Sequence, residues 1–141
     1  MDKKYLSEAL RSLEIADHMF YVSYLLIQDK KLLLKIFIEL HKSVINLIKF
    51  VVSGNCEVND LDFILKKFFE KDACEIGLNN EQTKKIKEII FLGNKYQNSA
   101  IEFVRNEKVV IMSKNLNIEV IDVKKIKDYL NIVKFFYSLI K

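Results

Sequence analysis

Two side chains on the first predicted helix have types and a spacing that suit chemistry on RNA. Arg11 and His18 stand seven positions apart, and Glu14 and Tyr21 follow the same helical intervals. Residues at such intervals share one helix face. A histidine can move a proton near neutral pH, and an arginine can hold a phosphate through two parallel hydrogen bonds. A ribonuclease could use such a pair. The alternative is a solvated helix face with two weak ion pairs.

The second histidine, His41, interrupts an apolar stripe on the next predicted helix. A buried histidine needs a hydrogen-bond partner, so His41 is either a satisfied core residue or part of a polar pocket. If the two helices are antiparallel, Arg11 lies near the height of Asn46, and His18 lies near Glu39 and His41. Two histidines with nearby carboxylates do not fix a metal-ligand spacing, so we predict no metal and no cofactor. The polar pocket that we predict consists of Glu14, Glu39, His41 and Asn46.

Arginine is rare in this chain, because only Arg11 and Arg105 among its 23 basic residues are arginine. Such a bias can keep arginine where a flat, forked guanidinium is required, although chance retention is the other explanation. Arg105 lies with Lys108 and Lys114 around a predicted β-hairpin. A basic hairpin can contact the RNA backbone. We therefore predict these three residues as a nucleic-acid-binding group, with ordinary surface charge as the alternative.

The elements that position these side chains begin with a helical hairpin over residues 6–52. Apolar residues recur every three or four positions in both halves, which indicates two amphipathic helices. Few polar residues separate the halves near residues 28–31, and so short a connection makes the helices antiparallel. The inward stripe of the first helix consists of Leu6, Leu10, Leu13, Ala16, Phe20, Tyr24 and Ile27, and Ile15, Met19, Val22 and Leu26 widen it; that of the second consists of Leu34, Phe37, Ile38, His41, Val44, Ile45 and Ile48.

The rest of the chain predicts material that closes a core against this pair. Two shorter helices are expected within residues 60–97, with Asp60 and Asn79 as caps. Short β-branched runs within residues 101–122 predict a small β-hairpin, and residues 101–105 can add a third strand. Asp122 caps a last helix over residues 123–140. We therefore expect one mainly α domain (α+β) over residues 1–141: an antiparallel helical bundle with a β-hairpin before its C-terminal helix.

Length and composition set limits on the class of protein. The chain has 141 residues, half of them hydrophobic, and a formal net charge of +4. Disorder is not expected at this hydrophobicity, and a charge excess this small does not by itself indicate nucleic acid. No apolar run reaches the length of a membrane span, and the first residues lead into an amphipathic helix and not into a signal peptide. We expect a cytoplasmic protein with no membrane partner.

The segment from Arg11 to His18 resembles the arginine–histidine motif of the HEPN superfamily, in which four to six residues separate the two. Members of that superfamily are small helical bundles. Many dimerise and cleave RNA at the dimer cleft, and others only bind nucleotides or partners. The resemblance implies catalytic positions for Arg11 and His18, and a homodimer. The chain is also similar over most of its length to small archaeal proteins of unassigned function, through Ala16–Met19 and the segment from Ser99 to Arg105; this implies no mechanism.

Three functions are consistent with these observations. The first is an RNA-associated, HEPN-like protein, either a ribonuclease or an inactive relative that binds nucleic acid or nucleotide. The second is a non-enzymatic dimer or protein-interaction module that uses its long helices as the interface. The third is a bundle that binds a small ligand or a metal. Whether the protein is an enzyme stays open, because the first two functions need the same exposed helix face.

Overall fold

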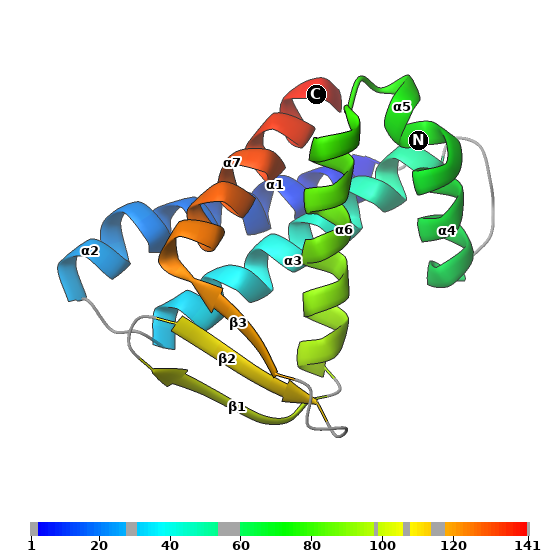
Figure 1. Ribbon diagram of the computed structural model, residues 1–141. Helices are drawn as coiled ribbons and strands as arrows, with labels where there is room; N and C mark the ends of the chain where they lie inside the picture. The colour runs from blue at the N-terminus through cyan, green and yellow to red at the C-terminus, as the bar shows by residue number, and fades with distance from the viewer. Residues whose placement is uncertain are drawn as a thin grey trace.

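The computed structural model describes residues 3–27, 31–53, 60–97, 99–105, 108–113 and 118–140; the side chains of Ser53 and of residues 96–119 lie outside this description. The fold is mainly α, with a small antiparallel sheet before the last helix, as the sequence predicts (Figure 1). The elements in chain order are α1 (Lys3–His18), η1 (Met19–Ser23), α2 (Tyr24–Ile27), α3 (Lys31–Ser53), α4 (Leu61–Lys67), η2 (Phe68–Asp72), α5 (Ala73–Glu75), α6 (Asn80–Gln97), β1 (Ser99–Arg105), β2 (Lys108–Ser113), β3 (Ile118–Asp122) and α7 (Val123–Ile140).

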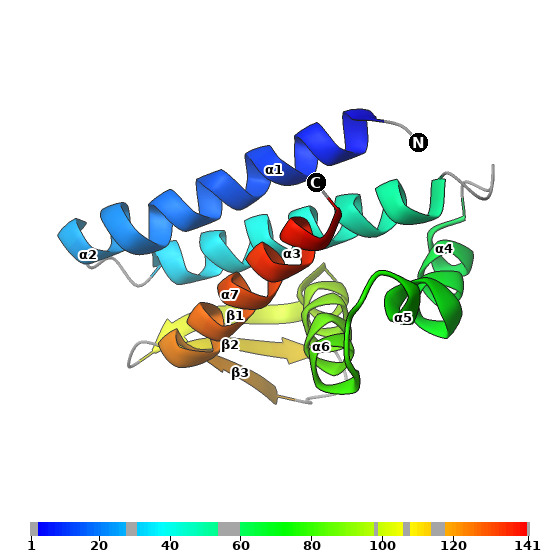
Figure 2. The same cartoon turned by 90° about the horizontal axis from the view of Figure 1, so that it is seen from above.

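Helix α3 is the centre of the fold. It packs against α1 on one side and against α6, α7 and α4 on the others. Figure 2 shows α1 and the sheet on opposite sides of α3, with α7 crossing it. The stripe that the sequence predicts on this helix is therefore only part of its buried surface. Leu33, Ile36, Leu40 and Leu47, which lie outside that stripe, are all fully buried.

The antiparallel pairing of α1 with α3 depends on small residues. Ala9 and Ala16 of α1 are completely buried and let the two backbones approach. The hydroxyl of Ser43 on α3 donates a buried hydrogen bond of 2.8 Å to the backbone carbonyl of Ala9. This bond fixes the register of the two helices and so decides which of their polar residues face one another.

A π-helical turn, η1, interrupts the first helix directly after His18. The backbone stays helical on both sides, and the N–H of Tyr24 donates to the carbonyl of Met19, five residues back. Each π turn takes one residue more than an α turn, which displaces the following side chains by roughly 100°. Phe20 is still buried, but Ile27 is 67% exposed. The predicted inward positions of Val22, Leu26 and Ile27 are therefore wrong, and Ile15, before the π turn, is 38% exposed as well. For Leu26 and Ile27 a second cause is that α2 projects beyond the end of α3 (Figure 1).

Predicted helix ends agree with the structure. The Asp60 carboxylate accepts from the N–H of Asp62, and Asp122 accepts from the N–H of Lys125. Asn79 and Gln82 form a reciprocal capping box at the start of α6, with bonds of 3.0 and 2.8 Å. Gly77, at φ +105°, ends the preceding helix in a conformation that a side chain disfavours.

The strands form a three-stranded antiparallel sheet in the order β1-β2-β3. The predicted hairpin is β2 with β3, paired from Lys108 opposite Asp122 to Met112 opposite Ile118. Residues 99–105 add β1 to it. Ile121 of β3 is fully buried, and the sheet contacts α6, α3 and α7.

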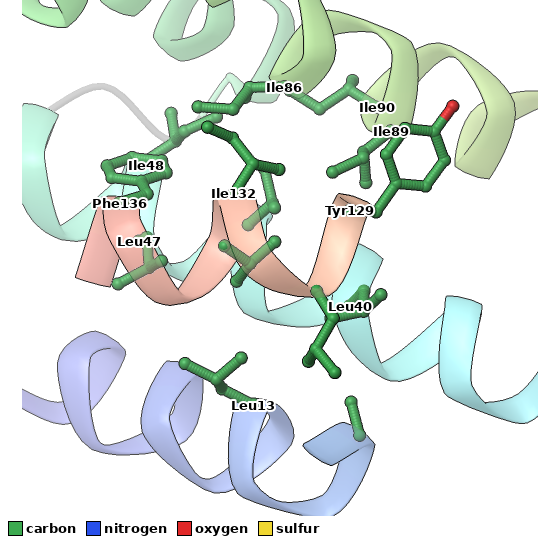
Figure 3. Packing of buried hydrophobic residues seen from close by; sticks show 14 of the residues in the cluster. Leu13, Leu40, Leu47, Ile48, Ile86, Ile89, Ile90, Tyr129, Ile132 and Phe136 are labelled. Carbon is green, nitrogen blue, oxygen red and sulfur yellow. The ribbon is translucent and has the colours of Figure 1, made fainter. Parts of the chain in front are cut away.

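The core is continuous from α1 to α6. Figure 3 shows Leu13 of α1 facing Leu40 and Leu47 of α3, and Phe136 and Ile132 of α7 facing Ile86 and Ile89 of α6. The Phe68 and Phe136 rings stack at 5.5 Å between centroids. The hydroxyl of Tyr129, whose ring is buried, donates to Glu88 at 3.2 Å. Burial and the nearby Glu88 carboxylate raise the pKa of Tyr129, so it stays neutral.

Candidate functional site

A polar hollow of about 310 Å³ lies between α1 and α3, at the height that the Ser43–Ala9 bond sets. Arg11 and Asn46, which the sequence predicts at one height, both contribute to it, and so does Glu39. Of the predicted site residues, Arg11, Glu39 and Asn46 line this hollow, whereas Glu14 does not. The lining consists of Glu8, Arg11, Ser12, Ile15, Glu39, Lys42 and Asn46.

The hollow is lined by charged groups of both signs, which suits an anion or an amide as ligand. Its two cations, Arg11 and Lys42, are balanced by the carboxylates Glu8 and Glu39. Lys42 Nζ lies 3.5 Å from Glu39 Oε1, and its side chain is mostly exposed. A phosphate there would be held by direct hydrogen bonds from the guanidinium and the ammonium and not by a strong net field, because the charges around it cancel.

His18 is the last residue of α1 and is exposed to solvent. It lies two turns along the helix from Arg11, on the same outward side, but it does not line the hollow. Glu14 lies exposed between them. The structure thus keeps Arg11 and His18 on one face, as predicted, but gives them no common cavity in the part of the chain it describes.

Lys134 of α7 is a neighbour of this face that the sequence pattern does not reveal. Its ammonium group contacts the carboxylate of Asp17 and lies 5.1 Å from the centroid of the Tyr21 ring. Asp17 directly precedes His18, and Tyr21 follows it by three positions. Because α7 is far from α1 along the chain, only the tertiary fold could bring this third cation to the α1 face.

His41 lies on a different side of α3 from Glu39 and Asn46. Its ring packs against α6 at Gly93, where an added Cβ would lie 2.0 Å from the histidine Cδ2. Its Nε2 is buried and has no hydrogen-bond partner among the described residues. Burial lowers the pKa of His41 below its ordinary value of 6.5, so the ring is neutral at pH 7.

The prediction that His41 shares a polar pocket with Glu14, Glu39 and Asn46 is therefore wrong for His41. The physical reason is the number of helices around α3. Because α6 covers its far side, a residue on that side can be half-buried without facing α1. His41 is a core residue beside a glycine, as one of the two sequence interpretations allowed, but its Nε2 is not satisfied by any described group.

The predicted basic hairpin is described only through its backbone. Arg105 at the end of β1 is opposite Lys108 at the start of β2, which places the two residues at one end of the sheet. Their side chains, and Lys114 altogether, lie outside the described residues. The nucleic-acid role of this group stays a prediction.

The described residues include one further buried carboxylate, that of Asp72. Asp72 of η2 is buried, and its Oδ2 has no hydrogen-bond partner within the described ranges. No group of three or more histidine, cysteine or carboxylate side chains among the described residues could hold a metal ion. Nor is any helix in the described part of the chain long and apolar enough to cross a membrane.

No protein-family model matches the chain, and no significant similarity was found to a curated protein or to a solved structure.

Proposed function

We propose that this protein is an RNA-associated, HEPN-like protein that uses the outward face of α1. The observation that carries the proposal is the placement of Arg11 and His18. Both are exposed on the same side of one helix, and Arg11 lines a hollow that Lys42 also lines. Arg11 would hold a backbone phosphate and Lys42 would supply an ammonium group beside it. Lys134 would supply another ammonium group further along, at Asp17 and Tyr21.

His18 has a role in the catalytic form of this proposal. As an exposed imidazole it can accept a proton from a ribose 2′-hydroxyl, which then attacks the neighbouring phosphorus and displaces the 5′-oxygen of the next nucleotide. In the inactive form the same face only binds RNA or nucleotide. Arg105, Lys108 and Lys114 form a second proposed contact with RNA, which rests on the sequence alone.

The alternative is a cytoplasmic, non-enzymatic homodimer in which the same face binds a second copy. One observation favours it. Ile15, Tyr21 and Val22 on the outward side of α1 and η1 are each 38–41% exposed, so an apolar row runs alongside Arg11 and His18. In the RNA-associated form a dimer would place two such rows, and two Arg11–His18 pairs, next to each other.

The test is RNA binding and cleavage by the full chain, measured beside its mass in solution. We expect Arg11→Ala to weaken binding of a single-stranded RNA at least about tenfold, the usual range for one lost charge-assisted phosphate contact, and Arg11→Lys to restore part of it. His18→Ala should abolish any cleavage while binding persists. Lys84→Ala, an exposed lysine on α6, is the matched control for loss of one surface charge.

One result would decide against the RNA-associated protein. Absence of RNA binding at low salt, where phosphate contacts are strongest, leaves the interaction module as the better proposal. If light scattering then gives a dimer that Val22→Asp dissociates, the module is supported. A monomer at concentrations of roughly tens of micromolar removes the dimer from both forms.

A further inference from the structure

Helix α2, which continues α1 and η1, carries three consecutive apolar side chains that are exposed to solvent. Leu25, Leu26 and Ile27 are 61, 80 and 67% exposed, and no residue of α2 is buried. Figures 1 and 2 show why: α2 projects beyond the end of α3 and leaves the bundle. Successive residues on a helix are about 100° apart, so these three side chains point in different directions around the axis. The end of the helix is apolar on most sides.

This shape fits a fluid partner better than a rigid one. A second protein chain would need a flat or matching surface, and each partner of a stable dimer contributes about 800 Å². Three partly exposed side chains supply well under that area on their own. A lipid surface instead surrounds a projecting tip and accepts apolar side chains from every direction.

Positive charge lies at the same end of the molecule. Both figures place the start of α3 beside the α2 tip, whereas the start of α7 lies farther away, next to the sheet (Figure 2). Lys31 and Lys35 stand in the first two turns of α3, and both are exposed. Anionic lipid headgroups attract lysines that lie close to the bilayer surface.

We propose that the α2 tip, Leu25–Ile27, inserts into the headgroup region of an anionic membrane, with Lys31 and Lys35 on the headgroups. Tyr21, partly exposed one turn behind, lies where interfacial tyrosines are usually found. The lipid surface differs from the sequence-based expectation of no membrane partner, which rested on the lack of a spanning segment; a surface tip needs none. The proposal is independent of RNA binding.

The chain contains no tryptophan, so a single introduced tryptophan reports on one place only. With Leu26→Trp we expect a blue shift and stronger emission when phosphatidylglycerol–phosphatidylcholine vesicles are added, and quenching by lipids brominated near the headgroups. Phe91→Trp is the control, because Phe91 on α6 is 55% exposed but lies outside the tip; its emission should not change.

Cosedimentation of the unlabelled protein with the same vesicles tests both parts of the surface. Replacing Leu25, Leu26 and Ile27 with serine should lower the bound fraction at least about tenfold, whereas Phe91→Ser should leave it unchanged. Lys31→Glu with Lys35→Glu should also release the protein, and Lys66→Glu with Lys84→Glu, an equal charge change on α4 and α6, should release less.

Three outcomes would overturn the proposal. The first is absence of binding to anionic vesicles by the unmodified protein. The second is equal loss of binding in the tip variant and its control. The third is a Leu26→Trp blue shift that needs no vesicles and grows with protein concentration, because it would show that a second copy covers the tip.

Discussion

At the residue scale, His41 of α3 packs against Gly93 of α6 and leaves no room there for a side chain. Alanine in place of a mid-helix glycine normally stabilises by about 1 kcal/mol. Here the added methyl group would lie 2.0 Å from the imidazole, so we expect Gly93→Ala to lower the free energy of unfolding by roughly 1–3 kcal/mol. His41→Ala alone opens a cavity at this contact and should cost about as much.

A double-mutant cycle separates this contact from other causes. In the His41→Ala, Gly93→Ala protein the new methyl group enters space that the ring has left, so the two losses should be less than additive. Urea denaturation of the four proteins measures this. Strict additivity would mean that His41 and Gly93 do not meet. His18→Ala, at an exposed position, should change stability by no more than about 0.5 kcal/mol.

The pH dependence of stability should also depend on His41. Its folded-state pKa is lowered by burial, so below about pH 6.5 the unfolded chain binds a proton that the folded chain resists. Stability is therefore fully present above pH 6.5 and falls as the pH drops toward the folded-state pKa, by at most about 1.4 kcal/mol per unit. His41→Leu should lose less stability than the unmodified protein between pH 7.5 and 5.5. A parallel loss in both proteins would contradict this.

At the scale of elements, the contact between α1 and α3 can be tested at Ser43. Ser43→Ala removes the buried hydrogen bond to the Ala9 carbonyl and should cost about 1 kcal/mol. Because the bond sets the register beneath the Arg11 hollow, RNA binding should fall with it if the proposed function holds. Ser138→Ala, which removes an exposed hydroxyl-to-backbone bond on α7, should change neither property measurably.

The elements also show how far local pattern predicts this structure. Caps at Asp60, Asn79 and Asp122 could be found because side chain and backbone partner are within four residues. The π turn after His18 could not, because the same apolar spacing fits an uninterrupted α-helix. A glycine inside a helical pattern indicates a weak point, yet α6 continues through Gly93. Glycine is needed at this position because the His41 ring of α3 occupies the space that a side chain would take.

The candidate site was predictable to the same limited extent. Arg11 and His18 share a face because of spacing along one helix, and Asn46 faces Arg11 because a short connection forces antiparallel packing. Glu39, which the sequence places near His18, lines the Arg11 hollow instead. The place of His41 depends on which helix covers the far side of α3, and that of Lys134 depends on how α7 crosses α1. Neither follows from any local interval.

At the scale of the whole molecule, the central position of α3 decides how the protein opens. This helix contacts α1, α4, α6, α7 and β2. Detaching any of these elements exposes part of α3, and unfolding α3 removes the surface against which all of them pack. Its amide protons should therefore exchange with deuterium only through global unfolding, whereas those of α2, with no buried residue, should exchange within the native state. Slow exchange would then appear as one block in the middle of the first half of the sequence, bordered on its N-terminal side by a segment that exchanges fast.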